Sequence, residues 1–559
     1  MRVPAALVAA MVLAVGLFHV GRPGYSVDEE FTEFAVRGIQ AHGVPLLPSG
    51  LLYDRGLAYS YASALVNGRA VSLICSALIV LLTFALVRRY VNAKSGLLAA
   101  ILVTTSVPFW ATATTARFYA PFLATFLAAL IAIDRPRLLL AIAVLARLLH
   151  ELGFLIAVVP FLVALLARGE RRRWFVSTAA AAAGLLLGQL LLFALHALEP
   201  ASGETMVRRF FLWQVRNLFE HPGDRQFSIA LMVVVVAIVI APKRAWWWIV
   251  SGLSAAAMIV AFSIARASNS APMSVDLISQ TLYGGSRYPL DMFWHIARTT
   301  PVTLFVAIST IALRFAGIGG EWRPAERTAH MLWIGWILWF GVIESGITTN
   351  YLLLPISFML IAIALDISAI VLDTNVGARF SAPAVALIVA AITLDQWRGE
   401  GSIVERLEAA RPTIHVEGID EIRESLQPTD RVVCTDELGC LMLVGRIDRW
   451  LALHEYVRAR FVVRRAEPAS PKPWAETGVY TGVPAVFRPR EVFSPNDDGS
   501  LPDRTIVIDI FKDYPIGNSR SWLPKAIEED GLEVTPLLET PQARVLQVSP
   551  PERQACLQP

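Results

Sequence analysis

Two adjacent acidic residues, Asp28 and Glu29, are the first side chains of the sequence that are suited to acid–base chemistry. They follow an apolar segment and open a loop that covers residues 21–70. Ionised carboxylates beside a bilayer are costly unless they serve a purpose. A carboxylate at this position can accept a proton from a hydroxyl group and act as a general base. One alternative stays open, namely that the two acids only stabilise the N-terminus of a helix through its dipole.

The residues after the acidic pair predict a helix that lies along a membrane surface. Phe31, Phe34 and Ala35 share one helical face between residues 30 and 42, with polar residues on the opposite face. A second surface helix is expected over residues 57–65. The acidic pair would then stand at the start of the first helix.

The composition predicts a polytopic membrane protein. Of the 559 residues, 55% are hydrophobic and 17% are charged, and apolar runs of about 20 residues recur, as bilayer spans require. A net charge of +3 is too small to indicate a nucleic-acid partner. We expect about 13 transmembrane helices, over residues 4–20, 71–87, 96–114, 118–133, 138–166 (two short helices), 174–195, 229–241, 247–264, 301–313, 331–347, 351–372 and 381–394.

Basic residues in short loops predict the orientation of these spans. They lie on alternate sides of successive spans, and the positive-inside rule places them in the cytoplasm. The longer loops 21–70, 199–227 and 266–300 then face outward, together with everything after Gln396. The first span is expected to be an uncleaved anchor rather than a signal peptide. The basic residues are Arg2, Arg88, Arg89, Lys94, Arg135, Arg137, Arg168, Arg171, Arg172, Arg173, Lys243 and Arg244.

The chain changes character near residue 396, which predicts two domains. Residues 1–395 form the transmembrane domain, and residues 396–559 form an extracytoplasmic α/β domain. Cys434 and Cys440 would lie on the oxidising side of the membrane, and whether they form a disulfide is open. The expected strands are 431–434, 461–463 and 505–510, and the expected helices are 419–426, 451–456 and 522–529.

Several segments together resemble a known family. They are Asp28-Glu29, His42-Gly43, Pro48-Ser49-Gly50, Tyr53-Asp54-Arg55, Ala116-Arg117-Phe118-Tyr119-Ala120 and Tyr351-Leu352-Leu353-Leu354-Pro355. They resemble the GT-C superfamily of lipid-carrier-dependent glycosyltransferases, especially the branch of protein O-mannosyltransferases and lipid A aminoarabinose transferases. The chain departs from that branch in two places. Many relatives have Lys-Pro-Pro where this chain has Arg55-Gly56-Leu57, and an Arg where it has Asn350.

The resemblance implies an inverting transfer of a sugar from a polyprenyl-phosphate carrier to an acceptor on the extracytoplasmic face. Asp28 is then the general base, and Glu29 orients the acceptor or caps the helix. Arginines on outward loops can grip the donor phosphate, and we expect Arg55, Arg117 and Arg287 to do so. Arg208, Arg209 and Arg298 are instead expected to be surface or snorkelling side chains. No metal and no other cofactor is expected.

Polar and aromatic residues at outward turns are the expected lining of the sugar or acceptor pocket. They are Tyr53, Tyr119, His150, Glu151, Tyr288, Asn350 and Tyr351. His150 and Glu151 interrupt an apolar stretch, where polar residues usually line a cavity, although a purely structural helix turn explains them equally well. The expected partners are the polyprenyl-phosphate sugar, membrane lipids and a lipid, glycan or protein acceptor.

Two other classes of function fit a polytopic chain. A transporter or flippase of a lipid-linked substrate would also carry many spans, but we find no convincing internal repeat. A membrane scaffold is the third class, and the acidic pair argues against it. The resemblance implies a multi-pass protein of the bacterial inner membrane, and the sequence does not identify the sugar or the acceptor.

Overall fold

The computed structural model divides into two compact units. The bundle unit comprises Met1–Arg22, Asp54–Leu195 and Met206–Arg411, and the sheet unit comprises Pro23–Tyr53, His196–Thr205 and Pro412–Pro559. The loop after the first helix therefore groups with the C-terminal residues. The structure describes residues 2–21, 25–26, 29–46, 53, 56–150, 153, 155–157, 159–160, 171–196, 293, 296–343, 349–372, 378–397, 413–414, 416–451, 485–486, 489–493, 502–510, 519–541 and 543–549.

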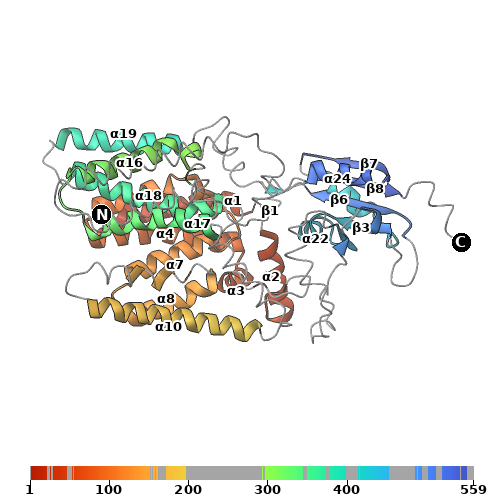
Figure 1. Cartoon of the computed structure of the whole chain (residues 1–559), viewed down its shortest axis with the longest axis horizontal. Coiled ribbons are helices and arrows are strands. Elements are labelled where there is room, and N and C mark those ends of the chain that lie inside the picture. The colour runs from red at the N-terminus through yellow and green to blue at the C-terminus, as the bar shows by residue number, and fades with distance from the viewer. Residues whose placement is uncertain are drawn as a thin grey trace. The chain divides into compact units, whose positions relative to one another are not determined.

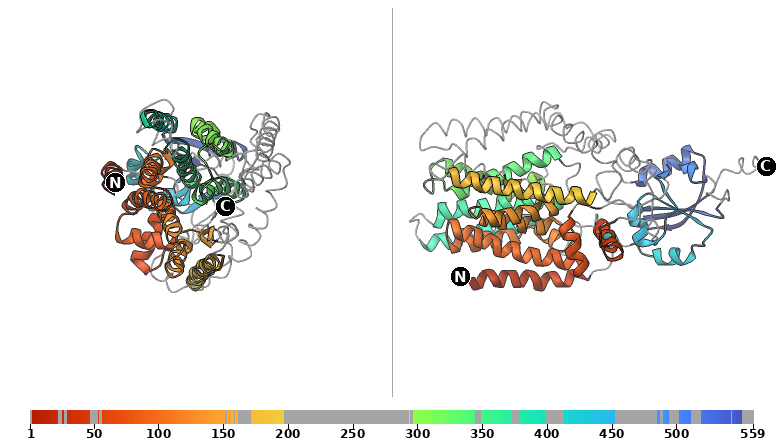
Figure 2. Two further views of the ribbon diagram at one scale, coloured as in Figure 1. Left: turned by 90° about the vertical axis from the view of Figure 1, so that its left-hand side faces the viewer. Right: turned by 90° about the horizontal axis from the view of Figure 1, so that it is seen from below.

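The bundle unit is a set of helices, most of which run side by side (Figure 1), and the left view of Figure 2 shows them end-on. Helix α3 matches the prediction for residues 57–65, and α8 ends where a break was predicted. The predicted spans 229–241 and 247–264 lie outside the described residues. The helices are α1 (Arg2–Val20), α3 (Leu57–Leu65), α4 (Gly68–Tyr90), α5 (Ala93–Thr104), α6 (Val107–Ala113), α7 (Tyr119–Ile131), α8 (Pro136–Leu149), α10 (Arg171–His196), α16 (Pro301–Phe315), α17 (Pro324–Ile343), α18 (Thr349–Ile367), its π-helical continuation η2 (Ser368–Leu372) and α19 (Ala378–Gln396).

Three helices of the described part are long and apolar enough to cross a membrane, namely Gly68–Tyr90, Arg173–Leu192 and Leu352–Val371. Helices α5 and α6 pass the same test only together, and they are bent by 71°. Residues 96–114, predicted as one span, therefore belong to two helices with a sharp bend between them. Ser106 has an extended backbone, and Pro108 in the first turn of α6 lacks the N–H that would continue the hydrogen bonds of α5.

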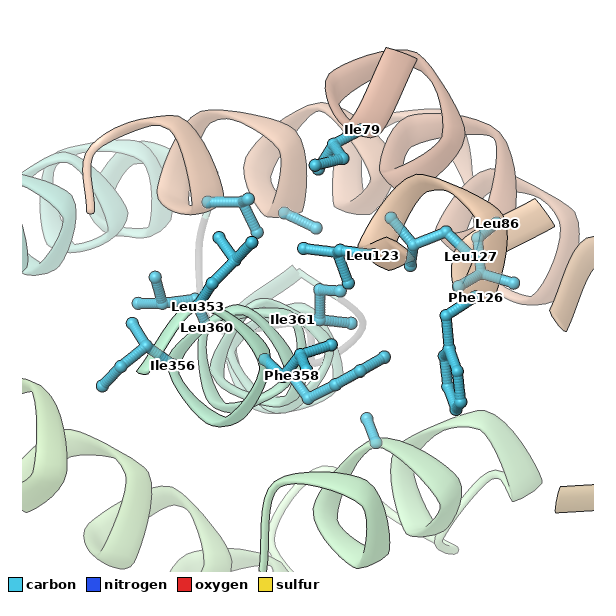
Figure 3. Close-up of a cluster of buried hydrophobic side chains, with 14 of the residues drawn as sticks. Ile79, Leu86, Leu123, Phe126, Leu127, Leu353, Ile356, Phe358, Leu360 and Ile361 are labelled. Carbon is cyan, nitrogen blue, oxygen red and sulfur yellow. The ribbon is translucent and has the colours of Figure 1, made fainter. Parts of the chain in front are cut away.

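Helix α18 forms the centre of the bundle core. In the most apolar stretch of this helix, 89% of the residues are buried inside the protein, as expected for a helix that is apolar all round. Phe358 of α18 contacts Phe126 of α7 at 5.6 Å between ring centroids, and Phe126 contacts Trp336 of α17 at 6.0 Å. Figure 3 shows Ile361 of the same helix facing Leu123 of α7. Helices α5, α6, α7, α16 and α17 therefore pack around α18.

Ion pairs hold three predicted cytoplasmic loops together. Asp134, in the turn between α7 and α8, binds Arg89 at 2.6 Å and Arg173 at 2.9 Å. Arg89 ends α4, and Arg173 lies in the first turn of α10. The structure thus brings Arg89 and Arg173 of these loops together at one end of the bundle.

A buried charge cluster joins α16, α17 and α18. Arg314 donates a hydrogen bond to Glu326 at 2.7 Å, and its Nε lies 3.9 Å from an oxygen of Asp366. His330 Nε2 lies 2.9 Å from Asp366, while Trp333 donates to His330 Nδ1 at 3.1 Å. Because Nδ1 accepts a hydrogen bond, Nε2 carries the proton and the imidazole is neutral. Arg314 is then the cation that faces two buried carboxylates.

The sheet unit is built on a six-stranded sheet with the strand order β5-β4-β3-β6-β8-β7. Strands β5, β4, β3 and β6 are parallel, and β8 is antiparallel to both of its neighbours. The elements of this unit are β1 (Tyr25–Ser26), α2 (Glu29–His42), β2 (Thr413–Ile414), α21 (Ile419–Ser425), β3 (Arg431–Cys434), α22 (Glu437–Leu443), β4 (Arg449–Leu451), β5 (Ala485–Val486), the 3₁₀ helix η5 (Pro489–Phe493), β6 (Thr505–Ile510), α24 (Ser519–Glu529), β7 (Glu533–Glu539) and β8 (Ala543–Ser549).

The two faces of this sheet have separate apolar cores. On one face Tyr25, Ile419 and Cys440 pack together with residues of β3, β6 and β8. On the other face, Val492 of η5 and Leu523 of α24 pack against alternate residues of the same strands. Buried strands covered by helices on both faces are typical of α/β domains.

Most of the elements predicted for the C-terminal domain are confirmed, and one is wrong. Strands 431–434 and 505–510 match β3 and β6, and the helices near 419–426 and 522–529 match α21 and α24. The predicted helix 451–456 is wrong at its start, because Leu451 ends β4, which pairs with β3 and β5. The predicted strand 461–463 lies outside the described residues. Cys434 and Cys440 form a disulfide with a Cα–Cα distance of 6.4 Å.

We expect that replacing Arg314 by Met destabilises the bundle unit strongly. The substitution removes the buried cation that faces Glu326 and Asp366, and losing one partner of a buried ion pair typically costs about 3–5 kcal/mol. Thermal unfolding of the purified protein in detergent measures the loss. Adding Glu326→Gln to Arg314→Met should restore part of the stability, and equal stability of all three proteins would contradict this role of the cluster.

The carboxylate of Asp430 predicts a pH-dependent stability of the sheet unit. A hydrogen bond from Arg504 holds the pKa of Asp430 below its usual range. The stabilisation is therefore present above the unfolded pKa of about 3.9 and is lost as the pH falls through the lower folded pKa. Asp430→Asn should destabilise the unit at pH 7 by about 1–3 kcal/mol, and the difference should shrink below about pH 4.

Chemical denaturation of the full chain between pH 3 and pH 7 measures this difference. Asp420→Asn is the matched control, because Asp420 pairs with Arg423 but 74% of its side chain is exposed. Exposed pairs contribute little, so the control should follow the wild type at every pH. Equal behaviour of the two variants would disprove the role of the Arg504 contact.

Candidate functional site

The structure describes the side chains of five predicted site residues. Glu29 and Tyr53 belong to the sheet unit, and Arg117, Tyr119 and His150 belong to the bundle unit. Asn350 and Tyr351 lie in the first turn of α18, and their side chains are outside the described part. The remaining predicted residues also lie outside the described part of the chain. They are Asp28, Arg55, Glu151, Arg287 and Tyr288.

Helix α2 begins at Glu29, one residue earlier than the sequence predicts. Glu29 and Glu30 both lie in its first turn and are buried, with 4% and 0% of their surface exposed. Carboxylates are favoured at this position because the positive end of the helix dipole lies there. Sequence analysis did not select Glu30 as a site residue. The sequence signal for Glu30 was its place in the acidic run Asp28-Glu29-Glu30. Glu30 is in line with the apolar face of the helix, where a side chain is expected to be buried.

Both ends of the loop 43–53 pack closely against α2. The rings of Phe31 and Tyr53 stack at 5.7 Å between centroids, and the Tyr53 amide donates to the carbonyl of Pro45 at 2.8 Å. A Cβ atom at Gly38 would lie 2.4 Å from the backbone of Leu46, so only glycine permits this crossing. Tyr53, a predicted pocket residue, therefore acts here as a packing partner of α2.

Three predicted site residues of the bundle unit lie together, and one of them is an arginine. Arg117, in the turn before α7, is buried and lies over the rings of Phe118 and Tyr119, at 4.8 Å and 6.0 Å from their centroids. His150 ends α8 and contacts Phe118 at 5.1 Å and Tyr119 at 6.0 Å. Phe122 contacts the same imidazole at 5.1 Å. We call these five residues the Arg117 cluster.

Helices α3 and α4 fix the backbone of the Arg117 cluster. Ser72 of α4 donates to the carbonyl of Arg117 at 3.1 Å, and the Tyr59 hydroxyl lies 2.9 Å from Ser72 and donates to the carbonyl of Gly68 at 2.6 Å. Gly56 caps α3 with a φ of +70°, and a Cβ atom there would lie 2.5 Å from the ring of Phe118. Buried hydrogen bonds and close contacts of this kind hold a site rigid.

Arg69 is a second buried arginine, which the sequence analysis did not consider. It lies in the first turn of α4 with 7% of its surface exposed, close to the 5% of Arg117. Asn67 caps this turn by accepting a hydrogen bond from the Arg69 amide at 2.9 Å. Arginine is rarely buried unless it is paired or functional. The signal in the sequence was an arginine next to an N-cap at an outward turn.

The chemistry available to these residues is anion binding and proton transfer. Guanidinium groups match the oxygens of phosphate in charge and geometry, and aromatic faces attract a cation without neutralising it. Carboxylates at the start of α2 are proton acceptors. Within the described ranges, no group of three or more His, Cys, Asp or Glu side chains is placed to hold a metal ion.

No protein-family model matches the sequence, and a search of curated proteins found no match. Solved structures do share similarity with this chain. ArnT from Cupriavidus metallidurans, bound to undecaprenyl phosphate, aligns over 97% of both chains with 12% identity and a TM-score of 0.45. Its apo state aligns over the same shares at a TM-score of 0.43. The archaeal oligosaccharyltransferase AglB from Archaeoglobus fulgidus, in complex with an inhibitory peptide and a dolichol-phosphate, aligns over 91% of this chain and 69% of its own, with 12% identity and a TM-score of 0.47.

Proposed function

We propose that this protein is an integral membrane glycosyltransferase of the GT-C type. It transfers a sugar from a polyprenyl-phosphate carrier to a hydroxyl group of a lipid, glycan or protein acceptor on the extracytoplasmic face. The observation that carries the proposal is the Arg117 cluster, a buried guanidinium at one end of a bundle of apolar helices. In Figure 1 the end of α8, which carries His150, lies near α3, at the opposite end of the bundle from the N-terminus.

The phosphate of a lipid carrier fits a site of this kind. A guanidinium in a low-dielectric surrounding attracts an anion more strongly than it does in water. The lipid tail of the same molecule fits the apolar helices of the bundle, since both avoid water. The His150 side chain packs against Phe122 and against Phe118 and Tyr119, the two rings that lie under Arg117.

The reaction is an in-line displacement at the anomeric carbon. The acceptor oxygen forms a bond to this carbon while the bond from the carbon to the phosphate oxygen breaks. Asp28 accepts the proton of the acceptor hydroxyl. The electron pair of the broken bond stays on the polyprenyl phosphate, whose additional negative charge Arg117 stabilises. A single displacement inverts the configuration of the sugar, and Glu29 orients the acceptor or caps α2.

Replacing Asp28 by Asn should reduce sugar transfer by at least about 100-fold, because the amide cannot accept the proton of the acceptor. The assay follows radiolabelled sugar from a panel of polyprenyl-phosphate donors into a cell-envelope lipid and glycan extract. The wild type and the variant are compared at equal folded yield.

Glu33→Gln is the matched control for Asp28→Asn. Glu33 is an acidic residue of α2, but its side chain is 46% exposed and pairs with Arg37. Its loss should leave the transfer rate within about twofold, as for an exposed pair. Equal activity of wild type and Asp28→Asn would exclude this base.

Replacing Arg117 by Met should reduce kcat by about 10²–10³-fold, the usual effect of removing one group that stabilises developing negative charge. It should also weaken inhibition by the free product polyprenyl phosphate. Arg117→Lys should restore part of both, because it keeps the charge but loses the planar fork of donors. Arg88→Met removes an exposed arginine elsewhere in the same unit and should change neither value. Unchanged inhibition by polyprenyl phosphate in Arg117→Met would place its binding site elsewhere.

A further inference from the structure

The segment that carries the acidic residues is anchored in the sheet unit by a short strand. Strand β1 pairs with β2 in antiparallel register, with Tyr25 opposite Ile414 and Ser26 opposite Thr413. Tyr25 is 4% exposed and belongs to the apolar core that contains Cys434 and Cys440. The chain just before the acidic pair is therefore part of a core whose other members come from the C-terminal residues.

Helix α22 leaves space for the Tyr25 side chain at Gly439. A Cβ atom at Gly439 would lie 2.7 Å from the Tyr25 hydroxyl oxygen and 2.2 Å from a carboxylate oxygen of Asp436, so a larger residue cannot stand there without displacement. The disulfide from Cys440 to Cys434 ties α22 to β3. Tyr25 thus packs on a helix that is covalently fixed to the sheet.

Helix α2, which begins within the acidic segment, is held by the same elements that hold Tyr25. It packs against both α22 and β1. Ser26 is the last residue of β1 and Glu29 is the first residue of α2, so two residues separate the anchored ends. Because one residue spans at most about 3.6 Å of extended chain, the end of β1 and the start of α2 lie close together.

We propose that Tyr25, seated on α22, is a positioning residue for the acidic segment, so that the sheet unit sets the place of the base from which sugar transfer proceeds. The proposal rests on the proposed function for its effect on rate. Displacing a catalytic group by about 1 Å can lower a rate by about 10²-fold. A residue that only stabilises the fold would not have this effect on kcat.

The test compares substitutions on the two faces of the sheet in the full-length protein. Tyr25→Ala removes the anchor, and Tyr25→Phe is the conservative variant. Leu523→Ala is the matched control, because Leu523 is fully buried in the apolar core of the opposite face. Gly439→Ala displaces the Tyr25 hydroxyl without changing Tyr25 itself, and it serves if Tyr25→Ala does not fold.

The first readout is hydrogen exchange of residues 29–42, which needs no substrate. We expect at least tenfold faster exchange of this segment in Tyr25→Ala or Gly439→Ala, wild-type exchange in Leu523→Ala, and rates close to wild type in Tyr25→Phe. The second readout is sugar transfer, where kcat should fall at least tenfold in the anchor variants while the donor KM stays within twofold.

Equal exchange of residues 29–42 in the anchor variants and in Leu523→Ala would overturn the proposal. Faster exchange with an unchanged kcat would also overturn it, since the segment would then move without effect on the reaction. If the wild type transfers no sugar from any donor of the panel while the exchange results hold, the proposed function fails and the anchoring of the segment stands.

Discussion

A charge inside an apolar helical bundle must be matched by an opposite charge, a hydrogen bond or an aromatic face, because hydrocarbon offers no water in their place. This constraint decides where the polar side chains of the bundle unit lie. Asp134 gathers Arg89 and Arg173 between the ends of three helices. Arg314 and Glu326 meet in the interior, where neither is exposed. In both places the charges join helices, but only the Arg314–Glu326 pair is fully buried.

The Arg117 cluster obeys the same constraint in a different way. Two aromatic rings lie under the guanidinium, and a ring face attracts a cation through its quadrupole. The backbone of Arg117 is held by Ser72, so the side chain starts from a fixed point. A fixed cation is what an enzyme needs to stabilise an anion that forms only during the reaction. Arg314 is bound to Glu326 in the interior of the bundle, and Arg117 is the arginine proposed to meet the donor.

Sequence reasoning predicted those elements whose signal is local. Helix α3 and strands β3 and β6 follow from periodicity or from short apolar runs between turn residues, and their bounds were correct. The end of α8 at Leu149 was expected because polar residues interrupt an apolar stretch there. The bend between α5 and α6 was missed, because hydropathy reports composition and stays high across Ser106 and Pro108, whereas the bend is a property of the backbone.

The candidate site shows the same division between local and distant information. The residue types of the acidic run are enough to predict a proton acceptor, because each carboxylate at a position where its charge is costly can be recognised from the sequence alone. The burial of Glu30 and Arg69 was not predicted, because a local pattern such as a helix face only suggests burial, and the packing partners that complete it come from elsewhere in the chain. Tyr25 is the extreme case, since its strand has two residues and its partner strand begins only at Thr413. Adjacent residues thus indicate the chemistry of the acidic segment. Its position instead depends on the pairing of β1 with β2, which forms only when distant parts of the chain fold together.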